Sequence, residues 1–133
     1  MIGLLIVTHC DLGKELLNAA EFIVGRIEAS DAIAVTATTG SEGLRKGIQE
    51  KVARLHSGDG VIILTDMFGG TPSNLSLSFL AADRVEVLTG VNLPMVIAIV
   101  QYRASLKLAE LAEKAKEAGK TGISLASKLL EMP

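Results

Sequence analysis

The amino-acid sequence predicts an α/β domain built on a doubly wound, mostly parallel sheet of order 2-1-3-4, with helices on both faces. Short apolar runs bounded by Gly, Asp, Thr or Asn recur along the 133 residues, which is typical of strands covered on both faces. Segments of helical periodicity alternate with these runs, and strands joined by crossover helices pair in parallel. The strand order is that of the commonest small topology of this class, because periodicity alone does not define it.

Four apolar runs supply the predicted strands, at residues 2–7, 32–35, 61–64 and 85–88. Each run is rich in β-branched or other aliphatic residues and ends at residues typical of turns. The hydrophobicity is continuous rather than alternating along each run. We therefore expect every strand to be buried between two layers of helices.

Two amphipathic helices are predicted between the first three strands. Residues 12–27 place apolar side chains such as Leu16 and Ile23 at helical spacing, with charged side chains elsewhere around the cylinder. Residues 42–55 repeat this pattern, and Ser41 is a suitable N-cap. Each helix connects one predicted strand to the next and serves as a crossover.

The second half of the chain is predicted to be richer in helix. One helix begins near Thr71 and Pro72, because Thr is a good N-cap and Pro is preorganised for the first helical position, and it ends near Ala82. The remaining predicted elements are helices at residues 93–103 and 106–118, a break at 119–122 and an antiparallel edge strand at 123–127.

Composition predicts a soluble, cytoplasmic protein with one domain covering residues 1–133. A formal net charge of −2 and few aromatic side chains argue against nucleic-acid binding, which needs a basic surface and stacking platforms. The single cysteine, Cys10, cannot form an internal disulfide, and its neighbours lack the spacing of metal ligands. Residues 2–7 are too few for a signal sequence, and residues 91–100 cover only about half a bilayer.

A histidine and an aspartate follow neighbouring strands of the predicted sheet. His9 comes two residues after the first strand, and Asp66 comes two residues after the third. In a sheet of order 2-1-3-4 the crossovers of these strands leave on opposite faces, which opens a crevice at their carboxyl ends. We therefore expect the two side chains to meet there, with the carboxylate holding one imidazole nitrogen and leaving the other free as a nucleophile.

The segment after Asp66 is suited to holding an anion. Gly69 and Gly70 allow a close turn, and Thr71 opens a helix whose free N–H groups can bind phosphoryl oxygens. A nucleophilic imidazole beside such a turn is what phosphoryl transfer through nitrogen requires. The sequence holds no Walker A motif or dinucleotide-binding fingerprint, so we expect no cofactor and no metal, and a protein as the phosphoryl donor.

The chain resembles the mannose-type IIA proteins of the bacterial phosphoenolpyruvate-dependent sugar phosphotransferase system. The resemblance covers essentially the whole chain and is carried by three blocks of sequence. These blocks are GLLIVTH at residues 3–9, TDMFGGTPSN at residues 65–74 and TGVNLPM at residues 89–95. The middle block is the most specific of the three.

The resemblance implies a role for each candidate residue. His9 would accept a phosphoryl group from the carrier protein HPr and pass it to a IIB protein, Asp66 would orient His9, and Thr71 would lie near the phosphoryl group. The family also implies a homodimer that exchanges a carboxyl-terminal edge strand, and peripheral association with membrane IIC and IID components through IIB. Met67 and Phe68, which lie near the site, are candidates for an apolar docking patch for HPr.

Alternative functions remain open from the sequence alone. A regulatory module could bind partners according to its phosphorylation state without moving sugar. The phosphotransfer subunit that feeds a dihydroxyacetone kinase also has a histidine after its first strand, but the block from Asp66 to Asn74 argues against it. A flavin or nucleotide binder would need a phosphate loop after the first strand, which is missing. Cys10 and His56 are interpreted as structural residues.

Overall fold

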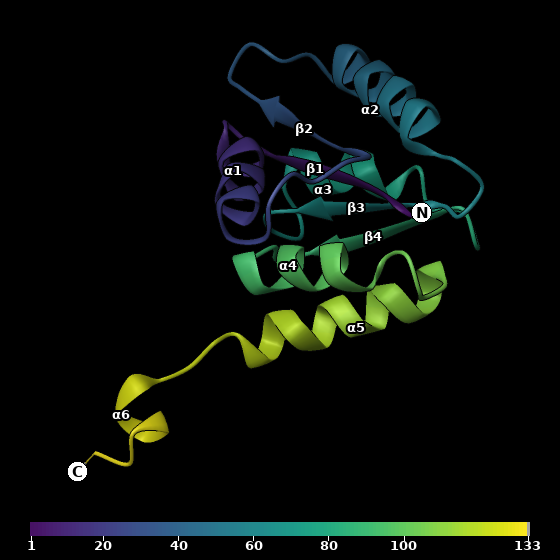
Figure 1. The fold of residues 1–133 in the computed structure, drawn as a ribbon. Helices are drawn as coiled ribbons and strands as arrows, with labels where there is room; N and C mark the ends of the chain where they lie inside the picture. The colour runs from purple at the N-terminus through teal and green to yellow at the C-terminus, as the bar shows by residue number, and fades with distance from the viewer. Residues whose placement is uncertain (133) are drawn as a thin grey trace.

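A computed structural model describes residues 1–132 and shows one sheet between two layers of helices (Figure 1). The sheet contains β1 (Gly3–His9), β2 (Ser30–Val35), β3 (Val61–Thr65) and β4 (Val85–Thr89). Its order is β2-β1-β3-β4 and every pairing is parallel, so the predicted topology is confirmed. β1 and β3 form the centre of the sheet, and both are almost wholly buried.

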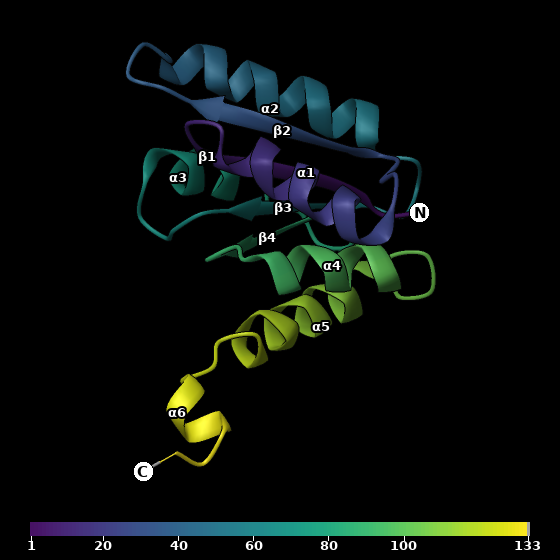
Figure 2. The same ribbon diagram turned by 60° about the vertical axis from the view of Figure 1, so that its left-hand side comes forward.

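Helices cover the two faces of the sheet unequally, as Figure 2 shows from a second direction. On one face lie α1 (Leu12–Val24), α4 (Leu93–Tyr102) and α5 (Leu108–Thr121). On the other lie α2 (Ser41–Leu55) and the short α3 (Thr71–Leu77). Among residues 1–132, no helix has both the length and the apolar character needed to cross a membrane.

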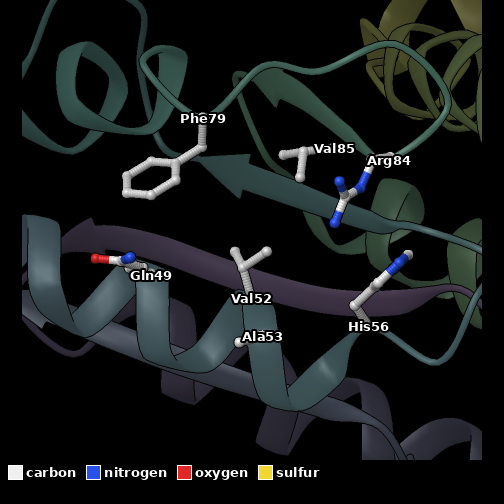
Figure 3. A pocket seen from close by; sticks show the side chains of 7 residues that line it. All are labelled: Gln49, Val52, Ala53, His56, Phe79, Arg84 and Val85. Atoms are coloured by element: carbon white, nitrogen blue, oxygen red, sulfur yellow. The ribbon is translucent and has the colours of Figure 1, made fainter.

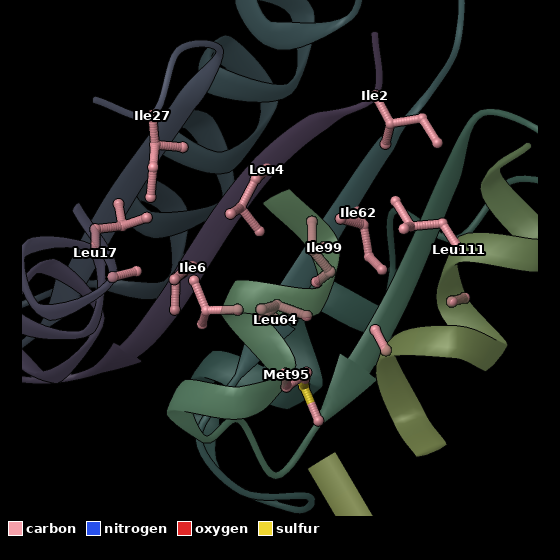
Figure 4. Close-up of a cluster of buried hydrophobic side chains, with 14 of the residues drawn as sticks. Ile2, Leu4, Ile6, Leu17, Ile27, Ile62, Leu64, Met95, Ile99 and Leu111 are labelled. Atoms are coloured by element: carbon pink, nitrogen blue, oxygen red, sulfur yellow. The ribbon is translucent and has the colours of Figure 1, made fainter. Parts of the chain in front are cut away.

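Each central strand contributes side chains to two separate hydrophobic cores, one on each face of the sheet, which explains its continuous hydrophobicity. Leu4 and Ile6 of β1 point into the cluster beneath α1, α4 and α5 (Figure 4), whereas Leu5 and Val7 point into the cluster beneath α2 and α3. All four are fully buried, and each burial stabilises the fold by roughly 1.5–3 kcal/mol. The same alternation places His9 on the face of the sheet that α2 and α3 cover.

Several helix boundaries differ from the predicted ones. α1 ends at Val24 rather than at residue 27, because Gly25 turns the chain away at a φ of 89°. α3 ends at Leu77 rather than at Ala82, and the hydroxyl of Ser78 donates to the Leu75 carbonyl at 2.6 Å, which competes with continued helical bonding.

The predicted N-caps were also displaced by one residue. Ser41 and Thr71 are the first residues of their helices, and the capping positions belong to Gly40 and Gly70. Neither glycine can supply a side-chain cap. The amide groups at the start of both helices therefore lack the oxygen acceptor that a Ser or Thr cap would provide.

The edge strand predicted for residues 123–127 does not form in the single chain. After α5 the chain runs away from the sheet and forms α6 (Ala126–Leu129) at some distance from the other elements (Figures 1 and 2). A strand requires a neighbour that supplies main-chain hydrogen bonds, and this segment has none within its own chain. Its apolar side chains are therefore exposed: Ile123, Leu125, Leu129, Leu130 and Met132.

Candidate functional site

The topology brings His9 and Asp66 into direct contact, as predicted. His9 is the last residue of β1, Asp66 follows the last residue of β3, and the two strands are hydrogen-bonded neighbours. The imidazole Nδ1 lies 2.8 Å from Asp66 Oδ2. β1 is longer than the sequence predicted, because its pairing with β2 continues beyond the apolar run to match His9 with Val35.

Asp66 holds the whole of His9, not only its ring. Oδ2 also accepts the main-chain N–H of His9 at 3.0 Å, and Oδ1 accepts the N–H of Met67 at 3.1 Å. The Asp66 side chain is only 13% exposed, whereas the His9 side chain is 48% exposed. The carboxylate is thus a fixed internal support, and the imidazole presents one side to the solvent.

The hydrogen bonds from His9 stabilise the charged form of Asp66. Partial burial by itself would raise the pKa of this carboxyl group. The main-chain and imidazole hydrogen bonds of His9, together with the charge of its ring, outweigh the burial and hold the pKa of Asp66 below its ordinary value of 3.8. Asp66 is therefore ionised at neutral pH and acts only as an acceptor.

An ionised Asp66 determines which imidazole nitrogen is free. Because the carboxylate can only accept, the neutral form of the imidazole carries its proton on Nδ1 and keeps a lone pair on Nε2. Nε2 lies on the side of the ring that approaches Gly70. A Cβ atom at this position would lie 2.9 Å from Cε1 and 3.4 Å from Nε2 of His9, so only glycine leaves the ring undisturbed.

The loop between Asp66 and α3 is shaped by its glycines. Gly69 has a φ of 94°, a conformation that residues with side chains rarely adopt. Its carbonyl accepts a hydrogen bond from the side-chain amide of Asn74 at 3.4 Å. The carbonyl of Gly70 accepts the N–H of Asn74 at 2.9 Å and so starts α3. The Thr71 side chain is exposed beside this start and has no hydrogen-bond partner within residues 1–132.

Thr8 is a supporting residue that the sequence reasoning missed. Its buried hydroxyl accepts the N–H of Gly13 at 2.9 Å and donates to the carbonyl of Cys10 at 3.3 Å. Cys10 has a φ of 52°, and its N–H donates to the Val35 carbonyl at 2.8 Å. Thr8 thus closes the turn between β1 and α1 directly behind His9. The available signal was a threonine inside an otherwise apolar strand.

The surface around His9 carries exposed apolar side chains. Met67 is 57% exposed and Phe68 is 71% exposed, in the loop that follows Asp66. Cys10, the residue after His9, is also exposed, but its left-handed backbone belongs to the turn that Thr8 closes. The residues that the structure describes contain no cluster of His, Cys, Asp and Glu that could hold a metal ion.

Comparison with protein families gives one match to most of the chain. The family model EIIA-man, described as "PTS system fructose IIA component", matches residues 3–116. The fructose-specific EIIA component of Bacillus subtilis (strain 168) is 29% identical over 132 residues, covering 98% of this chain and 90% of the relative. The mannose-specific EIIAB component of Escherichia coli (strain K12) is 30% identical over 124 residues, covering 92% of this chain but 38% of the longer relative.

Solved structures share the fold over nearly the whole chain. The phosphotransferase system component EIIA from Streptococcus agalactiae superposes with a TM-score of 0.87 at 31% identity, covering 96% of this chain and 99% of that one. The PTS IIA protein associated with the fucose utilization operon of Streptococcus pneumoniae gives a TM-score of 0.82 at 26% identity, covering 96% of this chain and 95% of that one.

Proposed function

The chain belongs to the EIIA-man family of phosphotransferase-system IIA components, and from this premise we propose that His9 carries the phosphoryl group as a phosphohistidine. The observation that supports this assignment most directly is the 2.8 Å contact between His9 Nδ1 and Asp66 Oδ2. It leaves Nε2 as the nucleophile on the exposed side of the ring. We infer a cytoplasmic carrier that receives the group from HPr and delivers it to a IIB protein.

In the proposed transfer, the Nε2 lone pair of His9 attacks phosphorus while the N–P bond of phosphorylated HPr breaks. The electron pair of that bond returns to the imidazole of HPr. The proton on Nδ1 stays in place, so the phosphorylated ring of His9 becomes positively charged. Asp66 stabilises this charge across the existing hydrogen bond and holds the ring in position throughout. Transfer to IIB reverses these steps.

The loop before α3 is the proposed seat of the transferred group. Gly70 lies against the ring edge that carries Nε2, so a phosphoryl group on that nitrogen would be close to the start of α3. The main-chain N–H groups of Gly69, Gly70 and Thr71 and the Thr71 hydroxyl are the donors proposed for its oxygens. We further propose that Met67 and Phe68 contact the protein partner, because both are exposed beside the imidazole.

We also propose that the protein acts as a homodimer in which residues 123–127 pair with the partner subunit. Two features support this proposal: β4 is an edge strand, and the apolar side chains after α5 are largely exposed in the single chain. Sedimentation analysis of the full chain, beside a chain ending at Gly122, would test it. A dimer that persists after truncation, or a monomeric full chain, would contradict the exchange.

The phosphoryl carrier itself is tested with the purified protein. Incubation with phosphoenolpyruvate, enzyme I and HPr should add one acid-labile phosphoryl group to the chain. His9→Ala should remain unlabelled. The chain has only two histidines, so His56→Ala is a matched control that should label normally. Labelling of His9→Ala would exclude the proposal, and discharge of the label by a purified IIB protein would test the onward step.

A further inference from the structure

The sequence block TGVNLPM, at residues 89–95, lies at the same edge of the sheet as His9, but it supplies none of the side chains that meet there. It begins with Thr89, the last residue of β4, which is paired with Thr65 at the end of β3. Asp66 follows Thr65 directly. The loop after β4 therefore adjoins the part of the main chain from which the Asp66 side chain departs.

Two main-chain hydrogen bonds tie this loop to the residue before Asp66. The N–H groups of Gly90 and Val91 both donate to the carbonyl oxygen of Thr65, each at 3.0 Å. That carbonyl belongs to the planar peptide unit whose nitrogen is the main-chain nitrogen of Asp66. The two bonds hold the plane of this unit, and the plane helps to determine the direction in which the Asp66 side chain leaves the main chain.

Asn92 holds the loop from its other side. Its side-chain oxygen accepts the N–H of Met95 at 3.1 Å and so caps α4. Its side-chain nitrogen donates to the carbonyl of Gly119, near the end of α5, at 2.9 Å. A Cβ atom on Gly119 would lie only 3.4 Å from Asn92 Oδ1, so the glycine lets α5 approach the loop closely. The side chain of Asn92 thus joins the loop to two helices at once.

The rest of β4 gives this end of the strand little additional support. At the beginning of the strand, Val85 borders an open apolar hollow, with Val52 of α2 and Phe79 on its other sides (Figure 3). In the single chain β4 is also an edge strand, with a hydrogen-bonded neighbour on one side only. The position of the loop that follows β4 therefore depends strongly on the hydrogen bonds of Asn92.

We propose that Asn92 is a positioning residue for phosphoryl transfer. Through the loop it holds the peptide unit between Thr65 and Asp66, and through Asp66 it aligns the imidazole of His9. Asn92 forms no hydrogen bond with His9 or Asp66, so its effect is transmitted by the main chain. A displacement of about 1 Å can slow a reaction about 10²-fold, so even indirect support of this kind matters. The inference rests on the proposed phosphoryl-carrier function and adds a residue to it.

Two substitutions separate this role from helix capping. Asn92→Ala removes both side-chain hydrogen bonds, whereas Asn92→Ser keeps an oxygen that can cap α4 but lacks the amide nitrogen that binds Gly119. Both should slow single-turnover transfer from phosphorylated HPr by about tenfold. Ile99→Val is the matched control, because it removes one buried methyl group from the second half of the same helix and destabilises the fold there. It should accept the phosphoryl group at the wild-type rate.

The tautomer of His9 is the second readout, because a general loss of stability would not change it. Nitrogen NMR of the unphosphorylated protein should show neutral His9 protonated on Nδ1 in wild type and in Ile99→Val. Asn92→Ala and Asn92→Ser should each show a mixture of both tautomers.

A wild-type tautomer or a wild-type rate in Asn92→Ser would overturn the proposal, and so would equal slowing in Ile99→Val. Failure of the wild-type protein to accept a phosphoryl group has a different meaning. That result would count against the carrier function, and the tautomer of His9 in the Asn92 variants would still decide whether Asn92 positions the imidazole.

Discussion

Replacing Asp66 by alanine tests how the imidazole is activated. The substitution removes the hydrogen bond to Nδ1 at 2.8 Å and the hydrogen bond to the His9 main chain at 3.0 Å. Without the first bond, the ring is free to rotate and to place its proton on either nitrogen. The second bond helps to hold the end of β1, so its loss adds to the disorder of the nucleophile.

The size of the effect follows from the charge on the ring. Phosphorylation at Nε2 makes the imidazole cationic, and a hydrogen bond between charged groups contributes about 1.5–3 kcal/mol. If that contribution is made mainly in the transition state, its loss slows transfer between about 10-fold and about 100-fold. Misplacement of the ring adds to this, so we expect Asp66→Ala to slow phosphoryl acceptance by about 10²-fold.

The assay measures single-turnover transfer of the phosphoryl group from phosphorylated HPr. The two proteins are mixed rapidly and the reaction is quenched in alkali. Asp31→Ala is the matched control, because Asp31 is also an ion-paired aspartate. It lies near the start of β2, and its partners are Lys51 and Arg54 of α2. Circular dichroism would verify that both variants are folded. A rate for Asp66→Ala within about threefold of wild type would refute the orienting role, since misoriented groups cost far more.

Further substitutions test the supporting structure. Gly70→Ala should slow transfer at least about tenfold, because the added Cβ atom pushes on the His9 ring. Gly40 also caps a helix but has open space around it, so Gly40→Ala should not slow transfer. Equal rates for the two variants would contradict the steric argument. Thr8→Val leaves a buried N–H without an acceptor and should lower the free energy of unfolding by about 1–3 kcal/mol in urea titrations; an unchanged midpoint would exclude this role. For Asp31, burial raises the pKa, but hydrogen bonds and the charges of its cationic partners outweigh it and lower the pKa below 3.8. The ionised Asp31 side chain therefore contributes to stability above pH 3.8, and this contribution is lost as the pH falls through the lowered pKa. The urea midpoints of Asp31→Asn should depend less on pH below about 4 than those of wild type. Parallel curves of midpoint against pH would contradict this.

The sequence was sufficient to predict the sheet and the contact at its centre. Continuous apolar runs identified β1 and β3, because a strand buried between two helix layers has no polar face. The same patterns identified β2 and β4, but the expectation that these strands are also buried was wrong, because both lie at an edge of the sheet and are only partly buried. Once the order 2-1-3-4 is assumed, His9 and Asp66 must follow adjacent strands at the same edge. Their contact was predictable because it depends on topology and not on any detail of side-chain packing.

Other features depend on interactions that hydrophobic patterns do not encode. β1 continues to His9 because main-chain pairing with β2 persists after the apolar run ends. The hydroxyl of Thr8 finds its partner on α1 only when the turn has formed, and the early end of α3 reflects side-chain bonds of serines to nearby carbonyls. The strand predicted at residues 123–127 needs an edge to pair with, and in the single chain this segment leads away from the sheet toward α6.

Asp66 Oδ2 accepts hydrogen bonds from both the ring and the main chain of His9, and this arrangement affects how such a protein can diversify. The proposed nucleophile ends one central strand and the carboxylate follows the other, so their alignment is set by the buried centre of the sheet. Met67 and Phe68 lie in an exposed loop, and their side chains make no hydrogen bond to His9 or Asp66. New side chains there can alter which proteins recognise the surface while the reacting nitrogen stays where it was, so recognition and reactivity can evolve separately.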